Sequence, residues 1–201
     1  MTGVEVRASE DPLDLLRIWW DDARERGAGL TDAVSLATVT PAGAPANRVV
    51  IAKRVDATGV VFVTSGTSAK GRDLAARPEA AVVFLWPDPL RQVRVGGPVE
   101  VLGDAESDDL FAAHAPLSRA GFVASRQSEP MDPAGLERLW ERIRELAEAP
   151  DELERPATWH GYRLVPTAVE FWSQAADHTQ TRVQFTRAAP TDPWHRRQVQ
   201  P

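Results

Sequence analysis

The sequence RVVIAK (48–53) is followed by VTSGTSAKGRDLA (63–75), RQVRVGG (91–97) and ASRQS (124–128). In these blocks, short apolar strands are interrupted by single cationic, hydroxyl or amide side chains. The chain as a whole is acidic, with a formal net charge of −6. Cations placed at strand ends and at a helix start in such a chain indicate that it binds a small anionic molecule.

The composition describes one domain over residues 1–201, with 43% hydrophobic residues available for a core. The negative charge and the lack of a long Lys/Arg run argue against nucleic acid as a partner. No apolar run approaches the roughly 20 residues of a membrane helix, and the N-terminal MTGVEVRASEDP has no apolar core of a signal peptide. Disulfides and thiolate metal sites are excluded because there is no cysteine. We expect a soluble, cytoplasmic protein without a membrane partner.

The first half of the chain is expected to form one helix and then mostly strands. The helix covers about 11–26, begins at Asp11-Pro12, and has an apolar stripe of Leu15, Leu16, Ile18, Trp19 and Ala23. The expected strands are 34–39, 46–55, 59–64, 79–86 and 91–102. Gly96-Gly97-Pro98 predicts a bulge or bend in the last of them. A short helix, 69–76, is expected after Ser68 as its cap.

The second half is expected to begin with helices and end in strands. Residues 104–126 look helical in two pieces capped by Asp104 and Ser118, and a longer helix starts at Asp132-Pro133. Its apolar stripe consists of Leu136, Leu139, Trp140, Ile143 and Leu146. A solvated loop at 151–156 and short strands over about 160–199 complete the chain. The predicted fold is mainly β, an antiparallel barrel with peripheral helices.

Hydroxyl groups gather where the strand 59–64 runs into the short helix. They are Thr64, Ser65, Thr67 and Ser68, and Lys70 follows them. Free N–H groups at a helix start favour a phosphate, and the lysine adds a full charge. The alternative is an ordinary serine-capped helix with a solvated lysine.

Other polar residues interrupt the strands singly. Arg48, inside an apolar strand, needs an anionic partner unless it lies on an edge facing water. Strict alternation points Lys53 to the opposite face, unless a bulge intervenes. Gln92 and the Gln127-Ser128 pair have the donors and acceptors that suit the pyrimidine edge of a flavin. Each is also compatible with a surface amide.

Two kinds of aromatic side chain could contribute to a site. Trp172 could shield a ring system or belong to the core. The four histidines are His114, His160, His178 and His195. Their spacing matches no metal site, and we expect none.

Taken together, the four blocks resemble the pyridoxamine 5′-phosphate oxidase family of FMN-binding split β-barrels, which includes phenazine-pathway oxidases. The similarity covers nearly the whole chain, including GYRLVPTAVEFW (161–172). It implies a homodimer with FMN at the interface, bound by both subunits. The implied cofactor-binding residues are Arg48, Val49, Val50, Ile51, Lys53, Val63, Thr64, Lys70, Gln92, Gln127, Ser128, Trp172 and Arg182.

The sequence departs from this family at several positions. Ala69 stands where an arginine usually precedes the loop lysine, and Val63 replaces a tyrosine. The positions that would hold the substrate are Lys53, Leu110, His114, Ser118, His178 and Gln180. Lys53 and Ser118 keep the family's residues, but Leu110 and His114 replace a tyrosine and an arginine. His178-Thr179-Gln180 replaces the family's Arg-Leu-His triplet, whose arginine and histidine lie over the substrate ring. Losing a phosphate-binding arginine argues against pyridoxamine phosphate as the substrate, since charge-assisted bonds are the strong ones.

The resemblance implies an FMN-dependent oxidase that takes hydride from a small, unphosphorylated substrate and passes electrons to molecular oxygen. AVSLATVTPAGAPANRVVIA (33–52) is similar to the phenazine-pathway members, so a dihydro-N-heteroaromatic intermediate is the leading substrate class. His178 could move a proton, and Arg182 could stabilise charge. The alternatives are a true pyridoxamine/pyridoxine 5′-phosphate oxidase, a non-catalytic flavin-binding protein, and a barrel that binds a deazaflavin.

Overall fold

The computed structural model describes residues 11–27, 29–149 and 152–201. Most of the N-terminal segment examined for a signal peptide lies outside these ranges. The strands are β1 (Ala33–Val39), β2 (Pro45–Asp56), β3 (Gly59–Ser65), β4 (Glu79–Pro87), β5 (Leu90–Val101), β6 (Trp159–Leu164), β7 (Ala168–Gln174), β8 (Gln180–Thr186) and β9 (His195–Gln198). The helices are α1 (Pro12–Glu25), α2 (Ala69–Ala76), α3 (Asp104–Ala112), α4 (Pro116–Ala124) and α5 (Pro133–Glu148). No helix among the described residues is long and apolar enough to cross a membrane.

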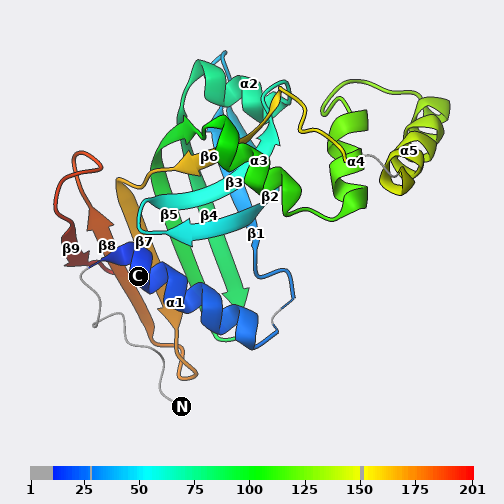
Figure 1. Cartoon of the computed structure of the whole chain (residues 1–201). Helices are drawn as coiled ribbons and strands as arrows, with labels where there is room; N and C mark the ends of the chain where they lie inside the picture. Colours follow the sequence, from blue (N-terminus) through cyan, green and yellow to red (C-terminus); the bar gives the residue numbers. More distant parts are fainter. Residues whose placement is uncertain (1–10, 28, 150–151) are drawn as a thin grey trace.

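The sheet closes on itself into a barrel (Figure 1). Its order is β4-β1-β2-β3-β6-β5-β7-β8-β9, and β4 also pairs with β5. Strands β1 to β6 therefore form a closed ring of antiparallel pairs, and β7, β8 and β9 extend the sheet beyond β5. The predicted fold, mainly β with peripheral helices, is confirmed.

Strand β5 changes its partner along its length. Its first part pairs with β7 at Arg91–Gly96, and its last part pairs with β6 at Val99–Val101. At the change, a Cβ on Gly97 would lie 2.9 Å from the backbone nitrogen of Thr167 and closer still to the carbonyl oxygen of Val165. A residue without a side chain is needed where these backbones pass so closely. The expected bulge or bend at Gly96-Gly97-Pro98 stays a prediction, since the pairing of β5 with β4 continues through these residues without a register shift.

Helix α1 packs its apolar face against the barrel core. The Asp11 carboxylate accepts a hydrogen bond from the Leu13 nitrogen at 2.8 Å, which caps the helix start. Trp19 is buried, and its ring meets that of Phe171 edge-on at 5.1 Å. The prediction for Ile18 was wrong, since this residue is 44% exposed. Trp20 is buried in its place, so the buried face of α1 is rotated away from Ile18.

The remaining helices match the expected positions more closely than the expected caps. Helix α2 begins after Ser68, as predicted. Helices α3 and α4 are the two predicted pieces of 104–126, but their N-caps are Gly103 and Ala115 rather than Asp104 and Ser118. For α4 the reason is Pro116, whose fixed φ suits the first helical position and starts the helix earlier.

Helix α5 lies away from the barrel and packs along α4 (Figure 1). Its start is capped by the Asp132 carboxylate, which accepts from the Gly135 nitrogen at 2.5 Å. Of the predicted apolar stripe, Ile143 is buried, whereas Leu136 and Trp140 remain about half exposed. We call α4, α5 and their connection the helical arm.

The loop that returns from α5 to β6 is less solvated than expected. Asp151, its first expected residue, lies outside the described ranges. The Arg155 guanidinium donates to the carboxylates of Asp104 and Asp108 and to the carbonyl oxygen of Trp159, at 2.8, 2.5 and 2.7 Å. The prediction of a solvated loop was therefore wrong at Arg155, which ties α3 to the start of β6.

Candidate active site

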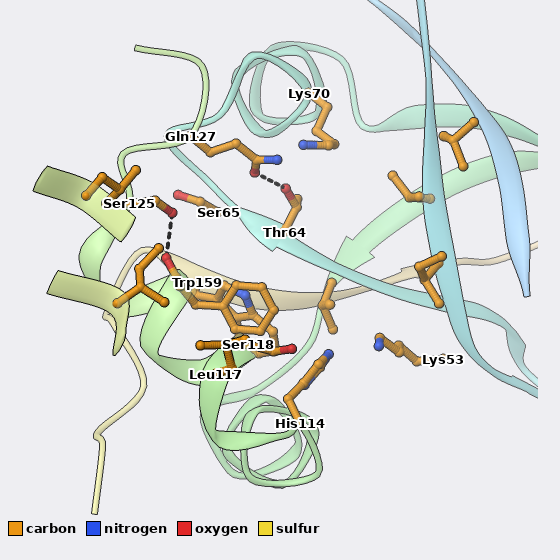
Figure 2. A pocket seen from close by; sticks show the side chains of 18 of the residues that line it. Lys53, Thr64, Ser65, Lys70, His114, Leu117, Ser118, Ser125, Gln127 and Trp159 are labelled. Atoms are coloured by element: carbon orange, nitrogen blue, oxygen red, sulfur yellow. Dashed lines mark hydrogen bonds between the residues drawn. The ribbon is translucent and has the colours of Figure 1, made fainter. Parts of the chain in front are cut away.

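A cavity of about 670 Å³ lies between the barrel and the helical arm (Figure 2). Its volume is typical of small-molecule sites. The barrel side is formed by β2, β3 and the start of α2, and the arm contributes side chains from both helices. The residues that line the cavity are Val49, Val50, Ile51, Lys53, Val63, Thr64, Ser65, Lys70, His114, Leu117, Ser118, Gly121, Phe122, Ser125, Gln127, Leu139, Trp140, Ile143 and Trp159.

One end of the cavity is built where β3 runs into α2. Ser68 caps the helix, and its hydroxyl oxygen accepts from the Gly71 nitrogen at 3.1 Å. The Thr64 hydroxyl donates to Gln127 Oε1 at 3.2 Å, and the Ala69 nitrogen donates to Ser128 Oγ at 3.2 Å. Residues about sixty positions apart in the chain therefore meet at one helix start. We call this the anion end, because the positive end of the helix dipole favours negative charge there.

Lys70 adds the positive charge of the anion end. The residue is only 7% exposed, and its ammonium lies 3.4 Å from Ser68 Oγ. Burial, together with the nearby charge of Arg48, lowers the pKa of Lys70 to about 8. An ammonium that is held in a partly dry site beside another cation is stabilised by an incoming anion. The serine-capped helix is present, but its lysine is buried rather than solvated.

Arg48 lies behind the anion end and does not line the cavity. Its guanidinium donates to Asp73 Oδ2 at 3.2 Å and to Thr38 Oγ1 at 2.6 Å. Asp73 is itself buried and accepts from the Thr38 hydroxyl at 2.7 Å. Arg48 therefore has an anionic partner, as the strand position required, and that partner is a protein carboxylate. A direct contact between Arg48 and a cofactor stays a prediction.

The opposite end of the cavity contains Lys53, His114 and Ser118. The register between β2 and β3 shifts at Lys53, between Ala52 and Arg54. Val49, Ile51 and Lys53, at alternate positions of β2, line the cavity, whereas Arg48 does not. Lys53 therefore lies on the opposite face from Arg48, as strict alternation predicted. Burial lowers the pKa of Lys53, partly offset by the charge of Asp32. We call this the aromatic end, because rings surround it.

The rings of the aromatic end come from the helical arm and from β6. Phe122 and Trp159 lie 5.2 Å apart between ring centroids, and both contact the His114 ring edge-on. Trp140 of α5 adds a third wall. None of these three was predicted as a site residue. In the sequence, Trp140 is one member of an apolar stripe, and its half-exposed position beside the cavity is seen only in the structure.

Leu110 does not line the cavity. Its side chain lies over Gly161, where a Cβ would be 2.7 Å from Leu110 Cδ1. Its carbonyl oxygen contacts Nδ1 of His114 at 2.7 Å. A substrate contact by the Leu110 side chain stays a prediction, whereas its backbone has a definite role in orienting His114.

A second cluster of predicted residues lies on β5, β7 and β8, outside the cavity. Gln92 on β5 lies opposite Trp172 on β7, and Trp172 lies opposite Arg182 on β8. The Trp172 indole donates to Gln180 Oε1 at 3.1 Å, and His178 Nδ1 lies 3.3 Å from the Gln174 amide. Arg182 Nε lies 3.2 Å from the carboxylate of Glu170. We call this the sheet cluster; Figure 1 places β8 and the helical arm on opposite sides of the barrel.

The chain matches known proteins over its whole length. Residues 30–146 match the family model described as pyridoxamine 5′-phosphate oxidase, and residues 159–201 match the pyridoxine 5′-phosphate oxidase C-terminal dimerisation region. A protein of Azorhizobium caulinodans named pyridoxine/pyridoxamine 5′-phosphate oxidase is 38% identical to this chain. The match covers 100% of this chain and 95% of the Azorhizobium protein.

Two solved structures share the fold. PhzG from Burkholderia lata 383, crystallised with tetrahydrophenazine-1-carboxylic acid, superposes with a TM-score of 0.90 at 30% identity, covering 97% of this chain and 95% of that one. A pyridoxamine 5′-phosphate oxidase-related, FMN binding protein from Nostoc punctiforme PCC 73102 superposes with a TM-score of 0.80 at 19% identity. The match covers 96% of this chain and 100% of the Nostoc chain. From its sequence matches and its barrel, the chain belongs to the pyridoxamine 5′-phosphate oxidase family.

Proposed function

We propose that this protein is an FMN-dependent oxidase of a small, unphosphorylated substrate, with a dihydro-N-heteroaromatic compound as the leading class. The observation that carries the proposal is the asymmetry of the cavity. Its anion end has a helix start and a buried lysine, which suit one phosphate. Among the described lining residues of its aromatic end, Lys53 is the one lysine or arginine. A second phosphate would find no comparable site.

The residues of the cavity fit FMN. Lys70 and the start of α2 would hold the phosphate, and Gln127 would offer amide groups to the pyrimidine edge. When bound, FMN supplies the hydride acceptor, and molecular oxygen is the expected final acceptor. Lys53 would orient the substrate, while Trp140 and Phe122 would exclude water from the reacting face.

The sheet cluster fits a homodimer in which it meets the cavity of the partner subunit. Trp172 and Arg182 are expected in the cofactor site but do not line the cavity of their own chain. The match of residues 159–201 to a dimerisation region includes both of them. In a two-fold dimer, each sheet cluster would complete the other subunit's site. His178 and Arg182 would then reach the reaction from across the interface.

Titration with FMN tests the proposal directly. We expect the purified protein to be yellow, or to take up about one FMN per subunit with a bound-flavin spectrum. Lys70→Met should weaken FMN binding by roughly tenfold to a hundredfold, because it removes a charge-assisted phosphate contact worth about 1.5–3 kcal/mol. Arg77→Met is the matched control, since Arg77 is an exposed cation at the end of the same helix.

Absence of any flavin spectrum after titration would overturn the proposed cofactor. Equal losses in the Lys70→Met and Arg77→Met variants would instead show that only the overall charge matters, and that the anion end does not bind the phosphate.

The affinity for FMN should depend on pH through Lys70. Its pKa of about 8 applies to the free protein, and the phosphate is best held by the protonated amine. FMN affinity should therefore decline slightly between pH 7 and 8 and steeply above pH 8, while the phosphate stays a dianion throughout. Lys70→Arg should remove this fall, because arginine keeps its charge. Isothermal titration between pH 7 and 9.5 measures the effect, and a flat wild-type profile would contradict it.

Mixed dimers test the sharing of the site. Lys70→Met damages the cavity and Arg182→Met damages the sheet cluster, so each variant alone should bind FMN weakly. In a dimer that contains one chain of each, one site combines an intact cavity with an intact sheet cluster. Co-expression with two different tags should therefore restore tight FMN binding in the mixed dimer. If no binding returns, both groups act within a single chain.

A second candidate is a true pyridoxamine/pyridoxine 5′-phosphate oxidase. The name and the 38% identity of the Azorhizobium relative favour it. The neutral or apolar residues at positions 110 and 114 favour the unphosphorylated substrate instead. Steady-state turnover separates the two.

A further inference from the structure

His114 is held in one orientation and one tautomer at the aromatic end. Nδ1 lies 2.7 Å from the carbonyl oxygen of Leu110. A carbonyl oxygen only accepts hydrogen bonds, so Nδ1 carries the hydrogen. In the neutral ring this leaves Nε2 with a free lone pair. Figure 2 shows the ring pointing into the cavity, toward Lys53.

The surroundings of His114 keep the ring neutral at pH 7. Burial lowers the pKa of His114 below its usual 6.5, and the positive charge of Lys53 lowers it further. Lys53, on β2, is the charged group that faces the ring. The groups from α4 and β6 are the uncharged rings of Phe122 and Trp159, at 5.0 and 5.8 Å between centroids. His114 therefore offers a hydrogen-bond acceptor where an arginine would offer donors.

We propose that the aromatic end selects a planar aromatic anion that carries an N–H donor beside its negative charge. Lys53 binds the anionic group, and His114 Nε2 accepts the hydrogen of the N–H. The rings of Phe122, Trp140 and Trp159 give the apolar walls that a planar ligand needs. This inference deepens the proposed function and rests on it only in taking this cavity as the substrate site.

The same arrangement discriminates against a ligand that presents a lone pair in place of the N–H. Two acceptors facing each other repel, and neither is then hydrogen-bonded. An aromatic ring nitrogen without hydrogen is such an acceptor. The site therefore binds the reduced, N–H form of a nitrogen heterocycle better than its dehydrogenated form, which favours release of an oxidised product.

Two probes of equal shape and charge isolate this contact. Carbazole-1-carboxylate has an N–H next to its carboxylate, and dibenzofuran-4-carboxylate has an ether oxygen at the same place. Calorimetry is done on the full chain, loaded with FMN if the protein binds it. The carbazole should bind about tenfold more tightly, as expected for one hydrogen bond. His114→Phe should abolish this preference but keep binding of both probes. His195→Phe, on the exposed strand β9, should leave it unchanged.

Nitrogen NMR of the histidine rings gives an independent readout. His114 should be the Nδ1–H tautomer with a pKa below 6.5, and Lys53→Met should raise that pKa. Equal binding of the two probes by the wild type, or an Nε2–H tautomer, would overturn the proposal. Both measurements also work on flavin-free protein, so failure to bind FMN would affect only the proposed function. If His114→Phe does not fold, the His114 tautomer and the preference of the wild type for the carbazole still test the proposal.

Discussion

The kcat/KM for pyridoxamine 5′-phosphate is expected to be on the order of a thousandfold lower than that of the Azorhizobium relative measured alongside. A phosphate at the aromatic end would meet Lys53 and the Ser118 hydroxyl, but a neutral imidazole at His114. A clamp arginine and a ring-facing arginine are both replaced, and each charge-assisted contact is worth about 1.5–3 kcal/mol. Steady-state assays with both proteins measure the ratio, and comparable turnover would restore the vitamin B6 assignment.

Introducing the missing charge sharpens this test. His114→Arg should raise the affinity for pyridoxal 5′-phosphate while leaving the FMN content unchanged, because position 114 is at the opposite end of the cavity from Lys70. Adding His178→Arg and Gln180→His should raise it further if the sheet cluster of the partner faces the same ligand. His195→Arg adds the same charge on an exposed strand and should have no effect. If none of the variants at positions 114, 178 and 180 binds pyridoxal 5′-phosphate more tightly, the substrate binds elsewhere.

Gly71→Ala is expected to lower the free energy of unfolding by about 2–4 kcal/mol and to weaken FMN binding more than Lys70→Met does. A Cβ at this position would lie 2.5 Å from the carbonyl oxygen of Gly66 and closer to that of Ser65. Backbone atoms cannot rotate away as a side chain can, so α2 must shift from β3. The shift breaks the Ser68 cap and moves Lys70 with it.

The control for Gly71→Ala is Gly103→Ala. No atom of the described residues lies within 4 Å of a Cβ built on Gly103, which precedes α3 with an ordinary φ of −62°. Urea denaturation followed by FMN titration compares the two variants. If Gly71→Ala unfolds at the wild-type urea concentration, the close packing of α2 on the end of β3 is not needed for stability.

The barrel and the anion end could be predicted from the sequence because their signals are local. Alternating apolar residues mark the strands, and Ser68 next to a strand end marks the start of α2. The meeting of Gln127 with Thr64 could be expected only from the resemblance, since no local pattern joins residues so far apart. The same holds for the sheet cluster, which the proposed dimer would bring to the cavity of a second chain.

Other parts of the site depend on tertiary contacts that leave no local pattern. The carboxylate that pairs with Arg48 belongs to Asp73 on α2, and nothing in either segment indicates this pairing. Lys53, by contrast, lies on the face of β2 that strict alternation predicted, opposite Arg48. Trp140 was predicted as part of an apolar stripe, but whether that stripe faces the barrel core or a ligand is decided by how α5 packs on α4.

The segment that contains α3 and the helical arm leaves and rejoins the barrel at neighbouring points. The Leu102 nitrogen, where the chain leaves β5, donates to the Gly161 carbonyl oxygen of β6 at 2.9 Å. The barrel holds the two ends of this segment together. A change in its length therefore costs little free energy of folding, since doubling a flexible loop costs only about 0.6 kcal/mol in closure entropy. Insertions, deletions and substitutions in the arm can thus reshape one wall of the cavity without disturbing strand pairing. The cavity thus combines one wall that is fixed by strand pairing with another whose length and sequence can change, so chains with this barrel can diverge in specificity while folding alike.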